Sequence, residues 1–191
     1  DGTRAVLTVA TLNKDKTGYD RALWEVPATG GGTPRRLTRS AKGEQGAAFT
    51  AAGDLLFVSA RPDAEGDGED EAAQLWLLPA SGGDARAITR LAGGVSGIAA
   101  VADAASVAVL AADLLPSADS IEADAKLRAE RKKRKLSAIL HTTYPVRYWD
   151  HDLGPAEPHL LSLELDALAD TIGSLAASDT AEDEPDATTP Y

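Results

Sequence analysis

The chain has 191 residues, of which 43% are hydrophobic, which suits one domain or part of a larger one. Its formal net charge of -11 argues against binding to nucleic-acid phosphates, which relies on Lys and Arg. No cysteine occurs, which excludes a disulfide framework and a thiolate metal site and fits a cytoplasmic location. No apolar run is long enough for a membrane span, so no membrane partner is expected. Methionine is absent even from position 1, so we expect a piece of a longer chain.

One short motif recurs along the first half of the chain. Leu-Trp-x-x-Pro-Ala-x-Gly-Gly occupies residues 23–31 and returns, 52 residues later, at 75–83. Each copy is followed by a short run that ends in Thr-Arg, with Thr38 in the first and Thr89 in the second. Three strand-like segments, at residues 3–8, 54–59 and 105–110, keep nearly the same period. Three sub-motifs that share one period near fifty residues predict a repeat architecture.

Each unit has the signals of four short strands. Pro27 closes the run that holds Leu23 and Trp24, because proline cannot donate to a sheet. The pair Gly30-Gly31 supplies the positive φ angles of a tight hairpin. Further strands are expected to end near Thr38 and to span 46–50 and 55–60. Four antiparallel strands per unit of this length are typical of a propeller blade.

The fold class expected is therefore all-β, a partial β-propeller of about three four-stranded blades with one helical insertion. The blade repeats are placed at about 1–63, 64–112 and 158–191, and the insertion at 113–157. A β-sandwich with an accidental repeat is the alternative. Trp24 and Trp76 are expected in the core between neighbouring blades rather than against a ligand.

The insertion begins where the repeat breaks after Leu110, because the next Leu-Trp-like strand comes only at residues 159–163. Asp119 followed by Glu122 predicts a capping box for a helix from Ser120 to about Ile139. Its apolar residues are few, so we expect a solvated helix at the propeller edge. A docking patch for an acidic partner, or for another subunit of a homo-oligomer, is the alternative. It rests on a basic cluster formed by Arg128, Arg131, Lys132, Lys133, Arg134 and Lys135.

Residues 144–150, Tyr-Pro-Val-Arg-Tyr-Trp-Asp, are interpreted as a strand that rejoins the blade, with rings that pack the insertion down. The alternative is that this aromatic segment lines a substrate path. The candidate residues for such a path are Tyr144, Arg147, Trp149 and Glu122.

No complete catalytic or metal-binding motif is present. Residues 94–97 fall one position short of Gly-x-Ser-x-Gly, and no phosphate loop occurs, so no catalytic residue and no cofactor are expected here. The spacing of the three histidines, His141, His151 and His159, does not match a helical metal pair. His151 lies between two aspartates and is expected to be a turn residue rather than an acid–base group. The acidic segments 63–71 and 178–190 are expected to be loops without metal, since 63–71 departs from the EF-hand spacing. Proteolysis is expected in 178–190.

The blade motif, Leu-Trp-x-x-Pro-Ala-x-Gly-Gly followed by Leu-Thr, resembles the N-terminal propeller of prolyl-oligopeptidase-type serine peptidases. The run Tyr144–Gly154, after a basic helical insertion, resembles the bacterial acylaminoacyl-peptidase-like branch more closely. The blade motifs alone are shared with open propellers of the TolB type.

The resemblance implies a propeller that caps an α/β-hydrolase domain outside this chain, which would hold the serine, aspartate and histidine. The propeller would admit short peptides and exclude folded proteins. Dipeptidyl-peptidase relatives hold the free amine with a glutamate pair, whereas Glu122 and Glu130 stand apart here, which favours acylaminoacyl-peptidase or oligopeptidase specificity. A non-enzymatic TolB- or WD40-like scaffold for protein partners is the alternative.

Overall fold

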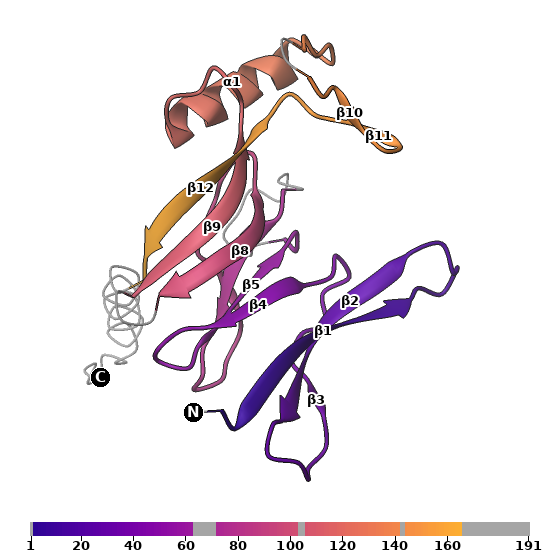
Figure 1. Cartoon of the computed structure of the whole chain (residues 1–191), viewed down its shortest axis with the longest axis vertical. Helices are drawn as coiled ribbons and strands as arrows, with labels where there is room; N and C mark the ends of the chain where they lie inside the picture. Colours follow the sequence, from indigo (N-terminus) through magenta and orange to yellow (C-terminus); the bar gives the residue numbers. More distant parts are fainter. Residues whose placement is uncertain (1, 63–71, 103–105, 142–143, 166–191) are drawn as a thin grey trace, which may run out of the picture.

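The computed structural model describes residues 2–62, 72–102, 106–141 and 144–165 (Figure 1). They form a mostly β structure with one helix, as the sequence predicts. The first sheet contains, in order, β1 (Arg4–Leu12), β2 (Tyr19–Pro27) and β3 (Arg35–Arg36). The middle sheet contains, in order, β4 (Gln45–Phe49), β5 (Leu55–Ser59), β6 (Gln74–Leu78) and β7 (Arg86–Ala87).

The third sheet carries the insertion between two of its strands. It has the order β12-β9-β8, from β8 (Val95–Ala102), β9 (Val107–Leu114) and β12 (Glu157–Glu164). Between β9 and β12 lie α1 (Ile121–Lys133), β10 (Arg147–Tyr148) and β11 (His151–Asp152). Every strand pairing in these sheets is antiparallel. None of the helical structure in this part of the chain has the length and apolarity needed to cross a lipid bilayer.

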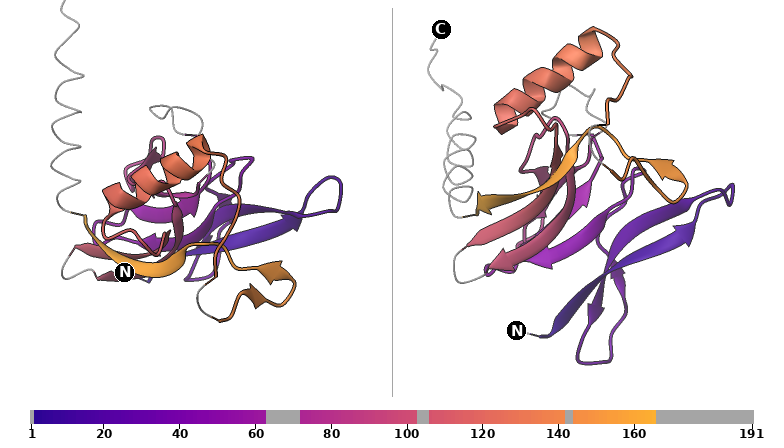
Figure 2. Two further views of the ribbon diagram at one scale, coloured as in Figure 1. Left: turned by 90° about the horizontal axis from the view of Figure 1, so that it is seen from above. Right: turned by 45° about the horizontal axis from the view of Figure 1, so that its top comes forward.

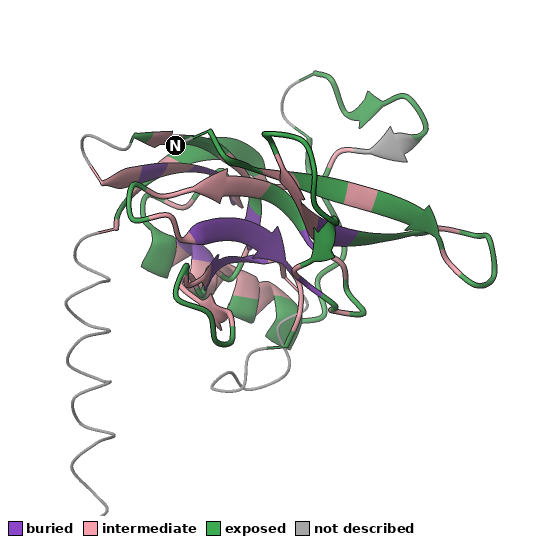
Figure 3. Ribbon diagram, turned by 90° about the horizontal axis from the view of Figure 1, so that it is seen from below, coloured by how far each residue is buried: buried purple, intermediate pink, exposed green. Residues whose placement is uncertain are grey.

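The three sheets are stacked, and the two central strands of the middle sheet, β5 and β6, are buried on both faces (Figures 1 and 3). Successive side chains of a strand point to opposite faces, and β5 uses both. Leu55 and Phe57 pack with Leu23 of the first sheet, whereas Leu56 and Val58 pack with Leu110 of the third. All five residues of β5 are therefore buried, which accounts for a continuous apolar strand in an antiparallel sheet.

The sequence repeat is reproduced in individual hydrogen bonds. The Leu23 N–H donates to the hydroxyl of Thr38, and the Leu75 N–H donates to that of Thr89, each over 2.9 Å. The N–H of the residue before each threonine donates to the carbonyl of the same leucine, over 2.8 Å in both copies. The Leu-Trp and Thr-Arg segments therefore form the same local structure twice.

The turn glycines are also equivalent in the two copies of the motif. Gly30 and Gly31 have φ of 74°, and Gly82 and Gly83 have φ of 94° and 103°, as the hairpin interpretation requires. The predicted strands at 46–50 and 55–60 are confirmed as β4 and β5. The strand predicted at 159–163 is confirmed as part of β12, which pairs with β9 as β6 pairs with β5.

The sheets are offset in phase from the repeat units placed at 1–63 and 64–112. The middle sheet runs from Gln45 to Ala87, so each unit crosses from one sheet into the next. The chain passes from the first sheet to the middle one after Thr38. In this connection the Glu44 N–H donates to the carbonyl of Arg21, and β4, the first strand of the middle sheet, begins at the next residue. Each repeat unit thus begins in one sheet and ends in the next.

The core positions predicted for the two tryptophans have different outcomes. Trp76 is buried between the first and middle sheets, and its indole N–H donates to the carbonyl of Ser59 over 3.1 Å. Trp24 occupies the equivalent place in the first sheet but is only half-buried and belongs to neither of the two core clusters. The prediction of a core position is therefore confirmed for Trp76 and not for Trp24.

Candidate functional site on the insertion

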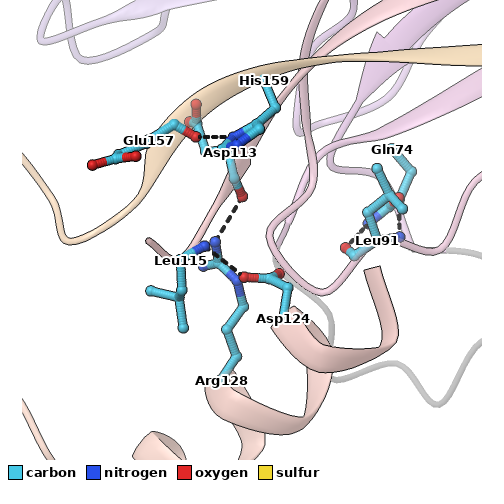
Figure 4. Close-up of polar contacts among 8 residues, drawn as sticks. All are labelled: Gln74, Leu91, Asp113, Leu115, Asp124, Arg128, Glu157 and His159. Atoms are coloured by element: carbon cyan, nitrogen blue, oxygen red, sulfur yellow. Dashed lines mark hydrogen bonds and ion pairs between the residues drawn. The ribbon is translucent and has the colours of Figure 1, made fainter. Parts of the chain in front are cut away.

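The insertion is fixed to the body by a polar cluster at the end of β9 (Figure 4). Asp124 of α1 is buried, and one carboxylate oxygen accepts from the Leu115 N–H over 2.8 Å. The other oxygen accepts from Arg128 Nε over 2.7 Å, one helical turn on. Arg128 also donates through Nη2 to the carbonyl of Asp113, over 2.7 Å. The helix is therefore held by an ion pair with a buried carboxylate, and both members of the pair bind the main chain at the end of β9.

Gly93 gives Arg128 the space to reach Asp113. A Cβ on Gly93 would lie 2.5 Å from the Asp113 carbonyl oxygen and 2.6 Å from Arg128 Nη2. Real Cβ atoms do not approach this closely, so any side chain at position 93 would displace the guanidinium. Gly93, Asp124 and Arg128 are henceforth called the insertion latch.

The helix is shorter than predicted at both ends. Ser120, and not Asp119, is the N-cap, and its hydroxyl accepts from the Ala123 N–H over 3.1 Å. Glu122 therefore occupies the second helical position, from which it cannot complete the predicted capping box. The helix ends at Lys133 because Lys135 takes a left-handed φ of 53°. Main-chain bonds from Lys135 to Lys132 and from Leu136 to Arg131 close a Schellman motif there.

The basic cluster of α1 consists largely of engaged side chains. Arg128 belongs to the latch, and Arg131 donates to the carbonyl of Ala138 over 3.0 Å. Arg134 pairs with Glu130 over 2.6 Å on the exposed surface. Cations in the last turn also interact favourably with the helix dipole. Much of this positive charge therefore stabilises the insertion itself.

Residues 144–150 do not rejoin the third sheet, and this prediction is wrong. β10 pairs with β11 as a separate two-stranded ribbon, in the register Tyr148 with His151. The rings do not pack the insertion down, because Tyr144 is 91% exposed and Trp149 is 85% exposed. Residues 139–146 also include several exposed apolar side chains, Ile139, Leu140 and Val146. The ribbon therefore presents its aromatic groups to solvent.

The four residues predicted to line a substrate path fall into two places. Tyr144, Arg147 and Trp149 lie on or beside the ribbon, which follows the C-terminal end of α1 (Figures 1 and 2). Glu122 lies in the first turn, at the opposite end of the helix, and is exposed. The ribbon is thus a cluster of three of the four candidates, with Glu122 apart from it.

The histidines lie on different elements. His141 follows α1, His151 is in β11 and His159 is in β12, where its Nδ1 lies 2.9 Å from the carbonyl oxygen of Glu157. The side chains of His151 and Asp152 fall outside the part that the structure describes, as do the acidic segments 63–71 and 178–190. Within the residues that are placed, no three acidic or histidine side chains gather as a metal site.

Two hollows lie near the junction of the first and middle sheets. One of about 250 Å³ opens between the first and middle sheets and is lined by residues 19–21, 41–45 and 58–60. Glu44 on its wall is buried, and its carboxylate accepts from the Thr38 hydroxyl over 2.9 Å and from the Ser40 N–H over 2.8 Å. A shallower hollow of about 590 Å³ lies nearby, along residues 37–42. The Glu44 carboxylate is therefore engaged within the connection from β3 to β4.

The latch was not predicted from the sequence, although part of it had a local signal. Asp124 and Arg128 stand four residues apart on a helix with almost no apolar stripe. Such a pair is ordinarily an exposed ion pair worth little. Its burial follows from the main-chain groups of Asp113 and Leu115, which only the fold brings to it.

No protein-family model matches this chain, and a search of curated proteins returns no match. The resemblance to prolyl-oligopeptidase-type peptidases therefore rests on the blade motif and the Tyr144–Gly154 run.

Proposed function

We propose that the three stacked sheets are consecutive blades of a β-propeller. The middle sheet has four antiparallel strands that are neighbours in sequence order, as a blade has. The first sheet matches its last three strands, and the third sheet matches its first three. The repeated Leu–Thr hydrogen bonds support one structural unit used several times.

We further propose that this propeller controls access to a cytoplasmic serine peptidase of the prolyl oligopeptidase family, acting on short acylated peptides or oligopeptides. The observation that carries this proposal is the exposure of Tyr144 and Trp149, in the run that bears the family resemblance. A ring packed into the insertion has a structural role only, whereas an exposed ring is available to a passing peptide. Acyl transfer would take place in a hydrolase domain outside this chain.

The test is serine-directed labelling of the complete gene product that contains this chain. A fluorophosphonate should label it, and acylated peptide p-nitroanilides should be cleaved faster than their free-amine counterparts. A gene product that ends with the propeller, or that resists the fluorophosphonate, would rule out the peptidase.

Replacing Trp149 with Ala tests the role of the ribbon within that enzyme. We expect KM for acylated peptides to rise several-fold while the fluorophosphonate labelling rate stays constant, because the exposed ring contacts substrate outside the reacting centre. Tyr19→Ala is the control, since Tyr19 is also an exposed ring, at 62%, but lies at the start of β2 rather than on the insertion. An unchanged KM in Trp149→Ala would remove the ribbon from the substrate path.

A non-enzymatic propeller scaffold is the second candidate. It is favoured by the charge of residues 126–147, which hold eight cations and one carboxylate in a chain whose net charge is -11. An exposed ribbon that follows a basic helix suits an acidic protein partner. The labelling experiment separates the two candidates.

A further inference from the structure

The larger hollow at the junction of the first and middle sheets is lined by both apolar and charged side chains. It has a volume of about 590 Å³ and lies between the connection from β3 to β4 and the middle sheet. Leu37, Leu78 and Ala85 on its wall are half-buried and pack against the core cluster that contains Trp76. The charged residues of the lining are Arg39, Lys42, Arg61 and Asp84. We call this site the junction hollow.

The charge of the junction hollow is opposite to that of the whole chain. The chain has 30 Asp and Glu residues against 19 Lys and Arg, whereas the hollow is lined by three cations and one carboxylate. Within the described residues, none of these three cations takes part in an ion pair. A concave surface lined mainly by charges of one sign raises the local concentration of ions of the other sign. The hollow is therefore suited to an anion.

Arg61 is held in place before any ligand arrives. Its guanidinium carbon lies 4.3 Å from the centroid of the Trp76 ring, which is buried and fixed by the bond from its indole N–H to the Ser59 carbonyl. The main-chain N–H of Arg61 donates to the Ser59 hydroxyl over 3.2 Å, and Nη2 donates to the Ala85 carbonyl over 3.4 Å. A guanidinium has five N–H donors, so this arrangement leaves most of them for a ligand. A stacked guanidinium also loses less conformational entropy on binding than a free one.

We propose that the junction hollow binds a small organic anion. Its carboxylate or phosphate group lies against Arg61, because a planar guanidinium binds either group through two parallel hydrogen bonds. Lys42 and Arg39 add positive charge, and the apolar part of the ligand contacts Leu37 and Leu78. The volume lies within the range of small-molecule sites, which favours a small ligand over a protein surface.

This site rests on the junction of two sheets and not on the peptidase activity, so a failure of either proposal leaves the other standing. The ligand would contact the connection that leaves the first sheet together with strands of the middle sheet. A ligand that binds only the folded state stabilises it. The anion should therefore stabilise the stacking of these two sheets.

Titration calorimetry of the complete gene product that contains this chain tests the proposal. The probes are phenyl phosphate, phenylacetate, inorganic phosphate and benzyl alcohol. We expect phenyl phosphate or phenylacetate to bind with a Kd of about 0.1–1 mM, and the tighter of the two identifies the preferred acid group. Inorganic phosphate should bind more weakly because it lacks the apolar part, and benzyl alcohol should not bind because it lacks the charge. Added salt should weaken the binding of both organic anions.

Substitutions locate the binding in the junction hollow. Arg61→Gln should weaken binding of the tighter anion by about 10-fold or more, because it removes charge-assisted hydrogen bonds. Arg61→Lys should give an intermediate loss, since it keeps the charge but not the planar fork. Lys42→Ala should weaken binding by about threefold, and its exposed position makes it a test that does not disturb the packing of Trp76. Lys14→Ala, an exposed lysine in the connection from β1 to β2, is the matched control and should bind like the unmodified protein.

Three results would overturn the proposal. The first is an unmodified protein that binds neither organic anion, and the second is benzyl alcohol binding as tightly as the anions. The third is equal affinity of the unmodified protein, Arg61→Gln and Lys42→Ala, which would place the binding elsewhere in the gene product. Circular dichroism of each variant would verify that the fold is retained.

Discussion

At the scale of single residues, the position of the insertion depends on a few polar atoms. Asp124 is 2% exposed and has one cation and one main-chain N–H as its partners. Removing the cation from a buried carboxylate strongly destabilises the folded protein, whereas an exposed ion pair of the same two residue types contributes little to its stability. The latch therefore stabilises the insertion through contacts that the apolar content of α1 cannot supply.

Gly93→Ala is the most selective test of the latch. The added Cβ would meet the Asp113 carbonyl and the Arg128 guanidinium, so we expect the free energy of unfolding to fall by about 1–3 kcal/mol. Gly97→Ala, in β8 just after the turn that holds Gly93, is the control, because no atom lies within 4 Å of the Cβ it would add. Urea denaturation would measure both. Equal stability of the two variants would show that Arg128 does not hold the position described.

At the scale of the elements, the sequence predicted what depends on neighbouring residues. The glycine pairs placed the hairpins, and the short apolar runs bounded by turn residues placed β5 and β6. The ends of α1 were missed because an N-cap one residue later and a left-handed Lys135 leave no distinct sequence signal. The ribbon was missed because a short apolar run does not reveal which sheet, if any, it joins.

The threonines that end each Leu-Trp unit are expected to matter in both copies. Thr38→Val and Thr89→Val keep the volume but remove a hydroxyl that accepts one bond and donates another. Each should lower the free energy of unfolding by about 1–3 kcal/mol, with the larger loss for the more buried Thr38. Thr33→Val, at an exposed position, should have little effect in the same urea titration. A loss in only one copy would contradict the equivalence of the two units.

At the scale of the whole molecule, the repeat determines how the sheets are stacked. A period near fifty residues places a Leu-Trp strand in each of the first two sheets, and in the middle sheet the alternation of side chains turns that dipeptide into a contact with both neighbours. The latch could not be predicted in this way, since it depends on contacts between the insertion and the end of β9. The proposed chemistry belongs to a domain outside this chain.

The most direct test of the propeller is an experimental structure of the complete gene product that contains this chain. The account predicts that Trp24 is buried there against a preceding sheet, as Trp76 is buried here, and that Leu160 is covered by a following one. A structure in which both residues face solvent, with the three sheets ending as they do in this chain, would contradict it.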